Sequence, residues 1–369
     1  MDERLKRFGF FIDCLIKKQS LPRKVVRDLF LEILKGDQTE IHQGAFLAAI
    51  TAKSPLPHEI AGVWEAIYEF DTVKVSLKIN ERVLDNCGTG MDSIKTFNIS
   101  TASAIIAAAA GVYLARHGAR AITSKCGTVD LCEALGIDVE CPVEKVKASI
   151  EQVGIGLFNG MSSQVHPGAL FRILSQMNFG SILNIAASLA NPVLPLYGVR
   201  GVYSKDMILP VIQTMSEIGY KRAMVFHGLL YGDKGIDEIS PSGETLVAEL
   251  LEDGRIITYS ILPEQMGLKS RINIEEILGE DDPLKEAIRL LHLLSGQDKG
   301  ILYDTVCLNC APILYIAGKV NELKEGIEMA REIIDSGKAF LCLKRWIEVQ
   351  NQEKDRGETI FSSLLSRVT

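Results

Sequence analysis

The stretch from residue 82 to residue 115 constrains the fold more than any other part of this chain. It begins with the short, partly β-branched segment Arg82–Cys87, which is typical of a strand. The turn Gly88-Thr89-Gly90 follows, and then an alanine-rich segment that we expect to be helical to about Ala115. A strand that breaks at glycines and continues as a helix leaves unpaired backbone N–H groups at the start of the helix. Such a helix start can bind a phosphate group.

The periodicity of apolar residues changes along the chain. Helical spacing dominates the first 70 residues, whereas short strand patterns alternate with helices from Glu81 onward. This alternation predicts an α/β fold with a mostly parallel central sheet flanked by helices. Residues 166–192 interrupt it with a loop signal and a new helical pattern. We therefore expect a smaller, discontinuous all-helical domain of residues 1–74 and 166–192, and an α/β domain of residues 75–165 and 193–369.

Local signals also predict several boundaries. Ser100 or Thr101 is suited to cap the helix after the glycine turn. The next strand is expected over residues 121–123. Asp130 and Glu133 have the spacing of a capping box for the short helix that follows.

Composition limits the classes of partner. The net charge of −7 gives no general electrostatic reason to expect nucleic acid or an anionic membrane. The longest apolar run, residues 102–115, is shorter than the roughly 20 residues that span a bilayer. The eight cysteines show no compact disulfide framework, and Cys307 and Cys310 lie in a helical pattern without a second pair, which favours reduced thiols over a zinc or redox site. We expect a cytoplasmic protein that does not enter membranes.

Three polar clusters fall where strands should end. The first contains the glycine turn with Asp92, Thr96 and residues 98–101, the second spans residues 116–124, and the third is Asp237-Glu238. Because the carboxyl ends of parallel strands face one crevice, these clusters can converge. Phosphate-binding N–H groups, cationic groups and hard oxygen ligands together suit a magnesium-bound phosphorylated substrate.

Each cluster also has an ordinary structural explanation. Ser100 and Thr101 fit helix caps, and Arg116 fits a charge that complements a helix dipole. Asp237 and Glu238 fit a solvated pair in a surface loop. The argument for a site therefore depends on the order of the clusters in the chain.

The ordered motifs resemble those of the anthranilate phosphoribosyltransferase family, whose fold is shared with pyrimidine nucleoside phosphorylases. The resemblance covers nearly the whole chain. It implies transfer of the phosphoribosyl group from phosphoribosyl pyrophosphate to anthranilate in tryptophan biosynthesis, with Mg²⁺ as cofactor and a homodimer formed through the helical domain. The motifs are Gly88-Thr89-Gly90-x-Asp92, Asn98-Ile99-Ser100-Thr101, His117-Gly118-x-Arg120, Asp130-x-x-Glu133-Ala134-Leu135-Gly136 and Asp237-Glu238.

The resemblance implies a role for each matching residue. Ser100, Asp237 and Glu238 match magnesium ligands. Arg116, which stands where the family has lysine, is implied in catalysis together with Asp237 and Glu238. Arg172 is the only candidate to meet the carboxylate of the acceptor. The implied substrate-binding residues are Gly88, Thr89, Gly90, Asp92, Thr96, Asn98, Ser100, Thr101, Arg116, Thr123, Ser124 and Arg172.

Departures from the family concentrate on the acceptor side. Met91 replaces a glycine of the phosphate loop, Ala119 replaces an asparagine, and residues 172–188 form a shortened segment without the usual arginine pair. Three alternatives therefore stay open: an enzyme of the same fold with a different acceptor, a phosphorolytic nucleoside enzyme, and a non-catalytic paralogue that binds nucleic acid or another ligand.

Overall fold

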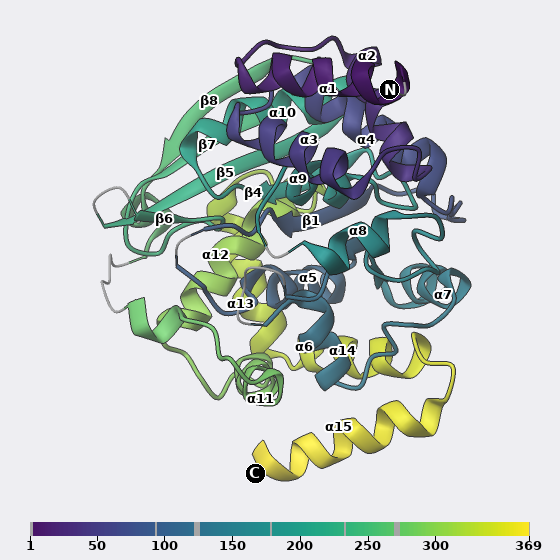
Figure 1. The fold of residues 1–369 in the computed structure, drawn as a ribbon. Coiled ribbons are helices and arrows are strands. Elements are labelled where there is room, and N and C mark those ends of the chain that lie inside the picture. Colours follow the sequence, from purple (N-terminus) through teal and green to yellow (C-terminus); the bar gives the residue numbers. More distant parts are fainter. Residues whose placement is uncertain are drawn as a thin grey trace.

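The computed structural model describes residues 3–92, 94–121, 126–177, 179–231, 234–268 and 274–368. Within these ranges the chain forms one central sheet with helices on both faces and a layer of amino-terminal helices on one side (Figure 1). The two termini lie at opposite ends of the molecule in this view. No helix in the described ranges combines the length and the apolar composition that crossing a membrane requires.

The amino-terminal region is all helical, as the periodicity predicts. It consists of α1 (Glu3–Ile16), α2 (Arg23–Leu34), α3 (Glu40–Ala52) and α4 (Pro57–Asp71). Two later helices, α8 (Leu170–Gln176) and α9 (Leu183–Leu189), share an apolar core with these four. The indole N–H of Trp64 in α4 donates to the carbonyl of Leu189 at 3.0 Å. The helical domain of residues 1–74 and 166–192 stays a prediction, which this shared core supports.

The central sheet has the strand order β3-β2-β1-β4-β5-β7-β8, and β6 pairs with β5. Strands β1 to β5 are mutually parallel, whereas β6, β7 and β8 are antiparallel additions at one side. The prediction of an α/β fold with a mostly parallel central sheet is confirmed. The strands are β1 (Val83–Gly88), β2 (Tyr113–Gly118), β3 (Ile155–Asn159), β4 (Tyr197–Gly201), β5 (Arg222–Tyr231), β6 (Lys234–Ile236), β7 (Thr245–Leu250) and β8 (Ile256–Ile261).

Further helices cover the sheet. Three of them, α5 (Ile99–Ala109), α12 (Ile301–Ile316) and α13 (Leu323–Asp335), pack together on the face opposite α4 and α10 (Ile208–Glu217) (Figure 1). The others are α6 (Thr128–Ala134), α7 (Val143–Val153), α11 (Pro283–Leu294), α14 (Lys338–Val349) and α15 (Lys354–Val368), with short 3₁₀ helices η1 (Lys205–Met207), η2 (Pro263–Met266) and η3 (Ile274–Ile277).

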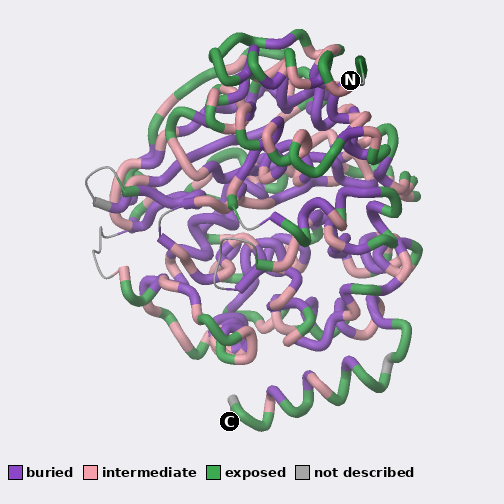
Figure 2. The backbone as a smooth tube through the Cα atoms, in the orientation of Figure 1, coloured by how far each residue is buried: buried purple, intermediate pink, exposed green. Residues whose placement is uncertain are grey.

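Strand β5 separates two apolar cores. Ala223 and Val225 face the core formed with the amino-terminal helices, whereas Met224 and Phe226 face the core that contains α5 and α12. This alternation is the period of two expected of a strand buried on both sides. In Figure 2 the buried residues follow the strands and the helices packed on them, while α15 exposes much of its length.

Several expected boundaries were wrong. The helix after the glycine turn ends at Ala109 instead of Ala115, because Gly111 adopts a φ of +83° and the residues from Tyr113 on form β2. Neither Ser100 nor Thr101 caps α5, since both lie inside its first turn and the residue before the helix is Asn98.

The prediction that Asp130 and Glu133 form a capping box was also wrong, because α6 begins at Thr128, before Asp130. Asp130 is the third residue of α6, and its carboxylate accepts the N–H of Gly127, which precedes the helix, at 3.0 Å. Glu133 instead forms an ion pair with Arg120. Most of the strand expected over residues 121–123 lies outside the described residues.

Candidate active site

The glycine turn after β1 forms the base of the site. Strand β1 lies between β2 and β4, so the chain connections diverge on either side of it and leave a crevice at its carboxyl end. The backbone N–H of Gly90 points into this crevice and donates to Asp237 Oδ2 at 2.8 Å. A Cβ on Gly88 would lie 2.2 Å from the same oxygen, so only glycine fits there.

The acidic pair Asp237-Glu238 follows directly after β6 and reaches the start of α5. The hydroxyl of Ser100 donates to Glu238 Oε1 at 2.7 Å. Residues separated by more than 130 positions in the chain thus meet at the carboxyl end of β1. Both carboxylates are buried, which is unusual for charged side chains and indicates a specific role.

Three buried carboxylates perturb one another at this point. Burial and, as a second cause, the nearby charge of Asp92 raise the pKa of Asp237 to about 7. Burial also raises the pKa of Glu238, with a second contribution from the charge of Asp237. The pKa of Asp92 is raised by burial, although Lys95 opposes that shift and donates to its Oδ1 at 3.2 Å. Such a group of carboxylates favours a bound cation.

The donor set around Glu238 suits magnesium held together with a phosphorylated ligand. In the described part of the chain, no three His, Cys, Asp or Glu side chains are arranged to hold a metal ion by themselves. Magnesium, however, commonly binds through one or two carboxylates and completes its octahedron with water and phosphate oxygens. Carboxylate and hydroxyl oxygens are therefore a fitting partial set.

Arg116 supplies a buried positive charge on β2. Its Nη1 donates to Thr101 Oγ1 at 2.9 Å, and its Nε donates to Asn86 Oδ1 at 3.1 Å. Asn86 in turn donates to the carbonyl of Ser100 at 2.8 Å. Among the described residues, Arg116 has no carboxylate within ion-pair distance. Burial lowers its pKa, and the more distant charges of Asp85 and Glu238 oppose that shift. This cation therefore lacks a direct counter-charge and is suited to meet an anionic ligand.

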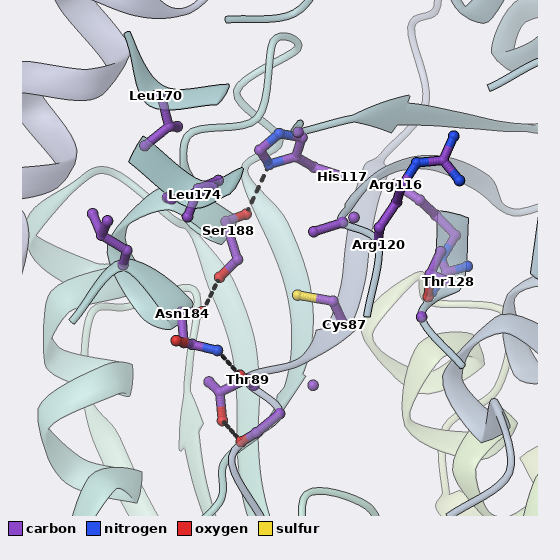
Figure 3. A pocket seen from close by; sticks show the side chains of 18 residues that line it. Cys87, Thr89, Arg116, His117, Arg120, Thr128, Leu170, Leu174, Asn184 and Ser188 are labelled. Atoms are coloured by element: carbon purple, nitrogen blue, oxygen red, sulfur yellow. Dashed lines mark hydrogen bonds between the residues drawn. The ribbon is translucent and has the colours of Figure 1, made fainter. Parts of the chain in front are cut away.

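Two adjoining cavities open at this end of the sheet. One of about 190 Å³ lies between the ends of β1 and β2 and the helices α8 and α9 (Figure 3). The other, of about 140 Å³, lies at the start of α5 beside the acidic pair. They share four lining residues, Gly88, Gly90, Gly127 and Thr128. We call them the helix-side cavity and the acidic cavity.

The walls of the two cavities differ in charge. Asp92, Asp237 and Glu238 line the acidic cavity together with Lys95. Among the described residues, no carboxylate lines the helix-side cavity, whose walls combine Arg116 and Arg120 with apolar side chains such as Leu174. Figure 3 shows Leu174 and Asn184 on one side of this cavity, facing Cys87 and Thr89 from the end of β1. The site therefore offers two compartments of opposite character.

The remaining predicted residues take different positions. Thr96 and Asn98 line the acidic cavity, but the side-chain amide of Asn98 also donates to Glu286 Oε1 at 3.0 Å and so braces α11. Thr89 lines the helix-side cavity, and its hydroxyl accepts the N–H of Tyr203 at 3.1 Å. Thr123 and Ser124 lie outside the described residues.

Arg172 is not brought to either cavity. Leu170 and Leu174, four residues apart on α8, face the helix-side cavity. Arg172 lies between them in sequence and therefore projects from another side of the helix, where it lines a groove with Lys35 and Thr39. The expectation that Arg172 meets an acceptor in this pocket is not supported.

Asn184 and His117 line the helix-side cavity but were not among the predicted binding residues. Asn184 donates to the carbonyl of Thr89 at 3.1 Å and joins α9 to the glycine turn. His117 lies 3.1 Å from His166 between their Nε2 atoms, and burial lowers its pKa to about 3, so its imidazole is neutral. The motif around His117 was visible in the sequence, whereas the position of Asn184 had no local signal.

The two departures near the turn have different consequences. Met91 adopts a φ of +71°, and its side chain packs where a Cβ on Gly180 would lie, 2.5 Å from Met91 Cε. It lines neither cavity, so it joins the turn to the segment before α9 without filling the site. Ala119 does line the helix-side cavity, and its small side chain leaves space there.

Comparison with known proteins gives consistent results. Residues 80–340 match the model of the glycosyl transferase family a/b domain, and residues 11–70 match the model of the helical bundle domain of that family. The anthranilate phosphoribosyltransferase of Persephonella marina is 35% identical over 337 residues, covering 91% of this chain and 96% of that protein. The enzyme of the same name from Methanosarcina acetivorans is 41% identical over 314 residues, covering 84% and 81%.

Solved structures agree with these matches. The anthranilate phosphoribosyltransferase of Thermus thermophilus superposes with a TM-score of 0.80 at 32% identity, covering 92% of this chain and 98% of that one. The Saccharomyces cerevisiae enzyme in complex with PRPP and Mg gives a TM-score of 0.79 at 23% identity, covering 96% and 98%. At 23% identity, the similarity to the Saccharomyces cerevisiae enzyme shows a shared fold and no more.

Proposed function

Because this chain belongs to the anthranilate phosphoribosyltransferase family, we propose that it transfers the phosphoribosyl group of phosphoribosyl pyrophosphate to anthranilate and releases pyrophosphate. This reaction belongs to tryptophan biosynthesis. The observation that carries the proposal is the meeting of Ser100 with Glu238 and of Gly90 with Asp237, at 2.7 and 2.8 Å, in a buried crevice at the end of β1. A solvated acidic pair would not be buried against a glycine turn and a helix start.

The acidic cavity is the proposed site of the diphosphate donor. Its wall includes the first turn of α5, where the helix dipole favours phosphate, although the N–H groups of Ile99 and Thr101 already donate to the carbonyls of Phe97 and Asn98. Thr101 and Ser100 add hydroxyl groups on the same turn. Ser100, Asp237 and Glu238 are the proposed magnesium ligands, and the bound ion would supply positive charge that stabilises the departing pyrophosphate.

The helix-side cavity is the proposed site of the acceptor. Its apolar walls suit an aromatic ring. Arg116, with no carboxylate among the described residues of the lining, suits an anionic substituent. The acceptor amine attacks C1 of the ribose from the face opposite the pyrophosphate, so that a C–N bond forms while the C–O bond breaks. Arg116 lines the helix-side cavity and donates to Thr101, which lines the acidic cavity. From this position its charge would stabilise the negative charge that develops on the leaving group.

A different acceptor is the second candidate function. It is favoured by Ala119, which leaves space in the helix-side cavity, and by the position of Arg172 outside it. An enzyme of the same fold with a larger or differently substituted amine acceptor would use the same donor site. The two candidates therefore differ only in what enters the helix-side cavity.

We also propose that the chain acts in the cytoplasm as a homodimer formed through its helical domain. Exposed apolar side chains on α1 and α3 support this assembly: Phe10 is 61% exposed, and Ile41 is 82% exposed. Helices α1 and α3 pack against each other, and exposed apolar side chains that gather into one patch mark a protein interface.

Two measurements test the proposed reaction. The fluorescence of anthranilate should decrease when the protein, phosphoribosyl pyrophosphate and Mg²⁺ are all present, and Glu238→Gln should abolish the decrease. In parallel, donor with Mg²⁺ should raise the thermal midpoint, because a ligand that binds only the folded state stabilises it. A midpoint shift without consumption of anthranilate would exclude anthranilate as the acceptor and leave a different acceptor or a non-catalytic paralogue. The absence of any shift at saturating donor would refute the donor site itself.

A further inference from the structure

Asn309 on α12 forms hydrogen bonds with the segment that carries the acidic pair. Its Oδ1 accepts the N–H of Ile239 at 2.7 Å, and its Nδ2 donates to the carbonyl of the same residue at 3.0 Å. Nδ2 also donates to the carbonyl of Thr305, one turn earlier in the helix, at 2.9 Å. Ile239 comes directly after Asp237-Glu238, so the side chain of Asn309 connects the helix to the acidic pair through a single residue.

Besides Asn309, the described residues hold this segment by hydrogen bonds from Gly90 and Ser100 to the two carboxylates and by Thr245, whose Oγ1 accepts the N–H of Ser240 at 2.9 Å. Strand β6 ends at Ile236, so the pair lies beyond the hydrogen-bond ladder of the sheet. On the sheet side it contacts bare backbone: a Cβ on Gly201 would lie 1.5 Å from the carbonyl oxygen of Asp237, and a Cβ on Gly228 would lie 2.3 Å from that of Glu238. These contacts limit how near the segment lies to the sheet, but they supply no hydrogen bond that fixes its register.

We propose that Asn309 is a positioning residue, which holds Asp237 and Glu238 at the distance from the glycine turn and Ser100 that a divalent cation with a diphosphate requires. This inference rests on the proposed function. Asn309 is buried and lines neither cavity, so its effect on ligands passes through Ile239. Its loss should therefore weaken cation binding, with little effect on the affinity for the acceptor.

The positioning role requires a carboxamide at position 309. Only a side chain with both an acceptor and a donor can pair with the N–H and the carbonyl of one residue. Asn309→Asp keeps the shape and the acceptor but loses the donor, and Asn309→Ala loses both. Displacements of about 1 Å at a catalytic group can cost roughly a hundredfold in rate, so a small shift of the acidic pair is sufficient.

Gln350 provides a matched control. Its Oε1 accepts the N–H of Leu157 at 3.0 Å, and its Nε2 donates to the carbonyl of that residue at 3.0 Å. This is the same arrangement of a buried carboxamide around one backbone residue, but Leu157 belongs to β3 and lines neither cavity. Gln350→Ala should therefore reproduce the loss of stability caused by Asn309→Ala without its effect on the cation.

The experiment is a titration with Mn²⁺ in the presence of inorganic pyrophosphate, followed by electron paramagnetic resonance. Asn309→Ala and Asn309→Asp should weaken Mn²⁺ binding by about tenfold or more, as loss of a group supporting a metal ligand commonly does. The affinity of Gln350→Ala for Mn²⁺ should stay within about twofold of that of wild type, since Gln350 supports no metal ligand. In steady-state assays the Asn309 variants should raise the Mg²⁺ concentration for half activity and leave the KM for the acceptor unchanged.

Each contrary outcome has a definite meaning. If both Asn309 variants bind Mn²⁺ as wild type does, or if Gln350→Ala weakens binding equally, the positioning role is overturned while the magnesium site stands. If Glu238→Gln, included in the same series, also binds Mn²⁺ as wild type does, the proposed magnesium site itself is wrong. Should Asn309→Ala fail to fold, the isosteric Asn309→Asp decides the question.

Discussion

At the scale of single residues, the carboxylates of the site oppose the stability of the fold. Asp92, Asp237 and Glu238 are buried beside one another, and each has a raised pKa with burial as the largest cause. A sequence selected only for stability would replace such a cluster with apolar or amide side chains. Its presence indicates that a ligand cation normally balances the charge.

The loss of stability caused by these buried carboxylates should depend on pH. The pKa of Asp237 is raised to about 7 in the folded protein, so between about pH 4 and pH 7 the folded state binds more protons than the unfolded state. The free energy of unfolding therefore falls as the pH rises through this window. Above the window, the ionised carboxylate destabilises the fold to its full extent. Without metal, Asp237→Asn should exceed wild type in unfolding free energy by about 1–3 kcal/mol at pH 8 and by much less at pH 5.

Urea unfolding in the presence of a chelator at both pH values measures this difference. Glu264→Gln, which removes an exposed carboxylate, is the control and should follow wild type at both. An identical pH dependence for Asp237→Asn and wild type would contradict the assignment of a strained carboxylate. Addition of Mg²⁺ with pyrophosphate should reduce the advantage of the variant, because the ligand stabilises only the wild-type arrangement.

At the scale of elements, glycines at strand ends allow backbone segments to approach closely. Gly88 ends β1, Gly201 ends β4, and Gly228 lies within β5, and each of them contacts the segment Asp237-Glu238. The acidic segment thus packs across three neighbouring strands where a side chain would keep it away. These glycines act through space, since none of the three has a positive φ.

Gly201→Ala should displace this segment. The added Cβ would lie 1.5 Å from the carbonyl oxygen of Asp237, which is backbone and cannot rotate away. We expect a loss of stability of about 1–3 kcal/mol or more, together with loss of donor binding. Gly44→Ala in α3 meets no atom within 4 Å and should instead stabilise the protein by about 0.5–1 kcal/mol. The thermal midpoints of the two variants, measured with and without donor and Mg²⁺, test this expectation. If both variants give similar midpoints and similar shifts with donor, the close approach of Gly201 to Asp237 is unimportant.

At the scale of the whole molecule, the sheet divides the two larger apolar cores, and the site lies where they meet. The acidic cavity is built by α5 and the acidic segment on one side, whereas α8 and α9 from the other core close the helix-side cavity. The hydrogen bond from Asn184 to Thr89 spans the two. Packing between the helical layer and the sheet is therefore part of the site.

The proposed homodimer is a property of this outer helical layer. Replacing Phe10 and Ile41 together with lysine places two charges on the exposed apolar surface of α1 and α3, which should dissociate the dimer. Leu341→Lys, on α14 and also exposed, should not. Sedimentation equilibrium or light scattering distinguishes the masses. A wild-type chain that is monomeric at all concentrations, or a double variant that remains dimeric, would contradict the proposed interface.

The local sequence determined the elements whose signals are short in range. The helical periodicity of residues 1–70 and the passage from β1 through the glycine turn to α5 both follow from neighbouring side chains. The end of α5 was missed because alanine has a high helix propensity, while the residues that follow it become β2 through pairing with β1 and β3. Strands β7 and β8 were missed for the same reason, since they form by antiparallel pairing, β7 with β5 and β8 with β7.

Distances between remote residues were decided only by the tertiary structure. The order of the strands brings Asp237 to Gly90 and Glu238 to Ser100, and the rotation of α8 turns Arg172 away from the pocket. The hydrogen bonds between Asn309 and the acidic segment likewise depend on how α12 packs against the sheet. Residue types and their order along the chain therefore identified the donor chemistry. The shape of the acceptor cavity came from packing between elements, which no local pattern encodes.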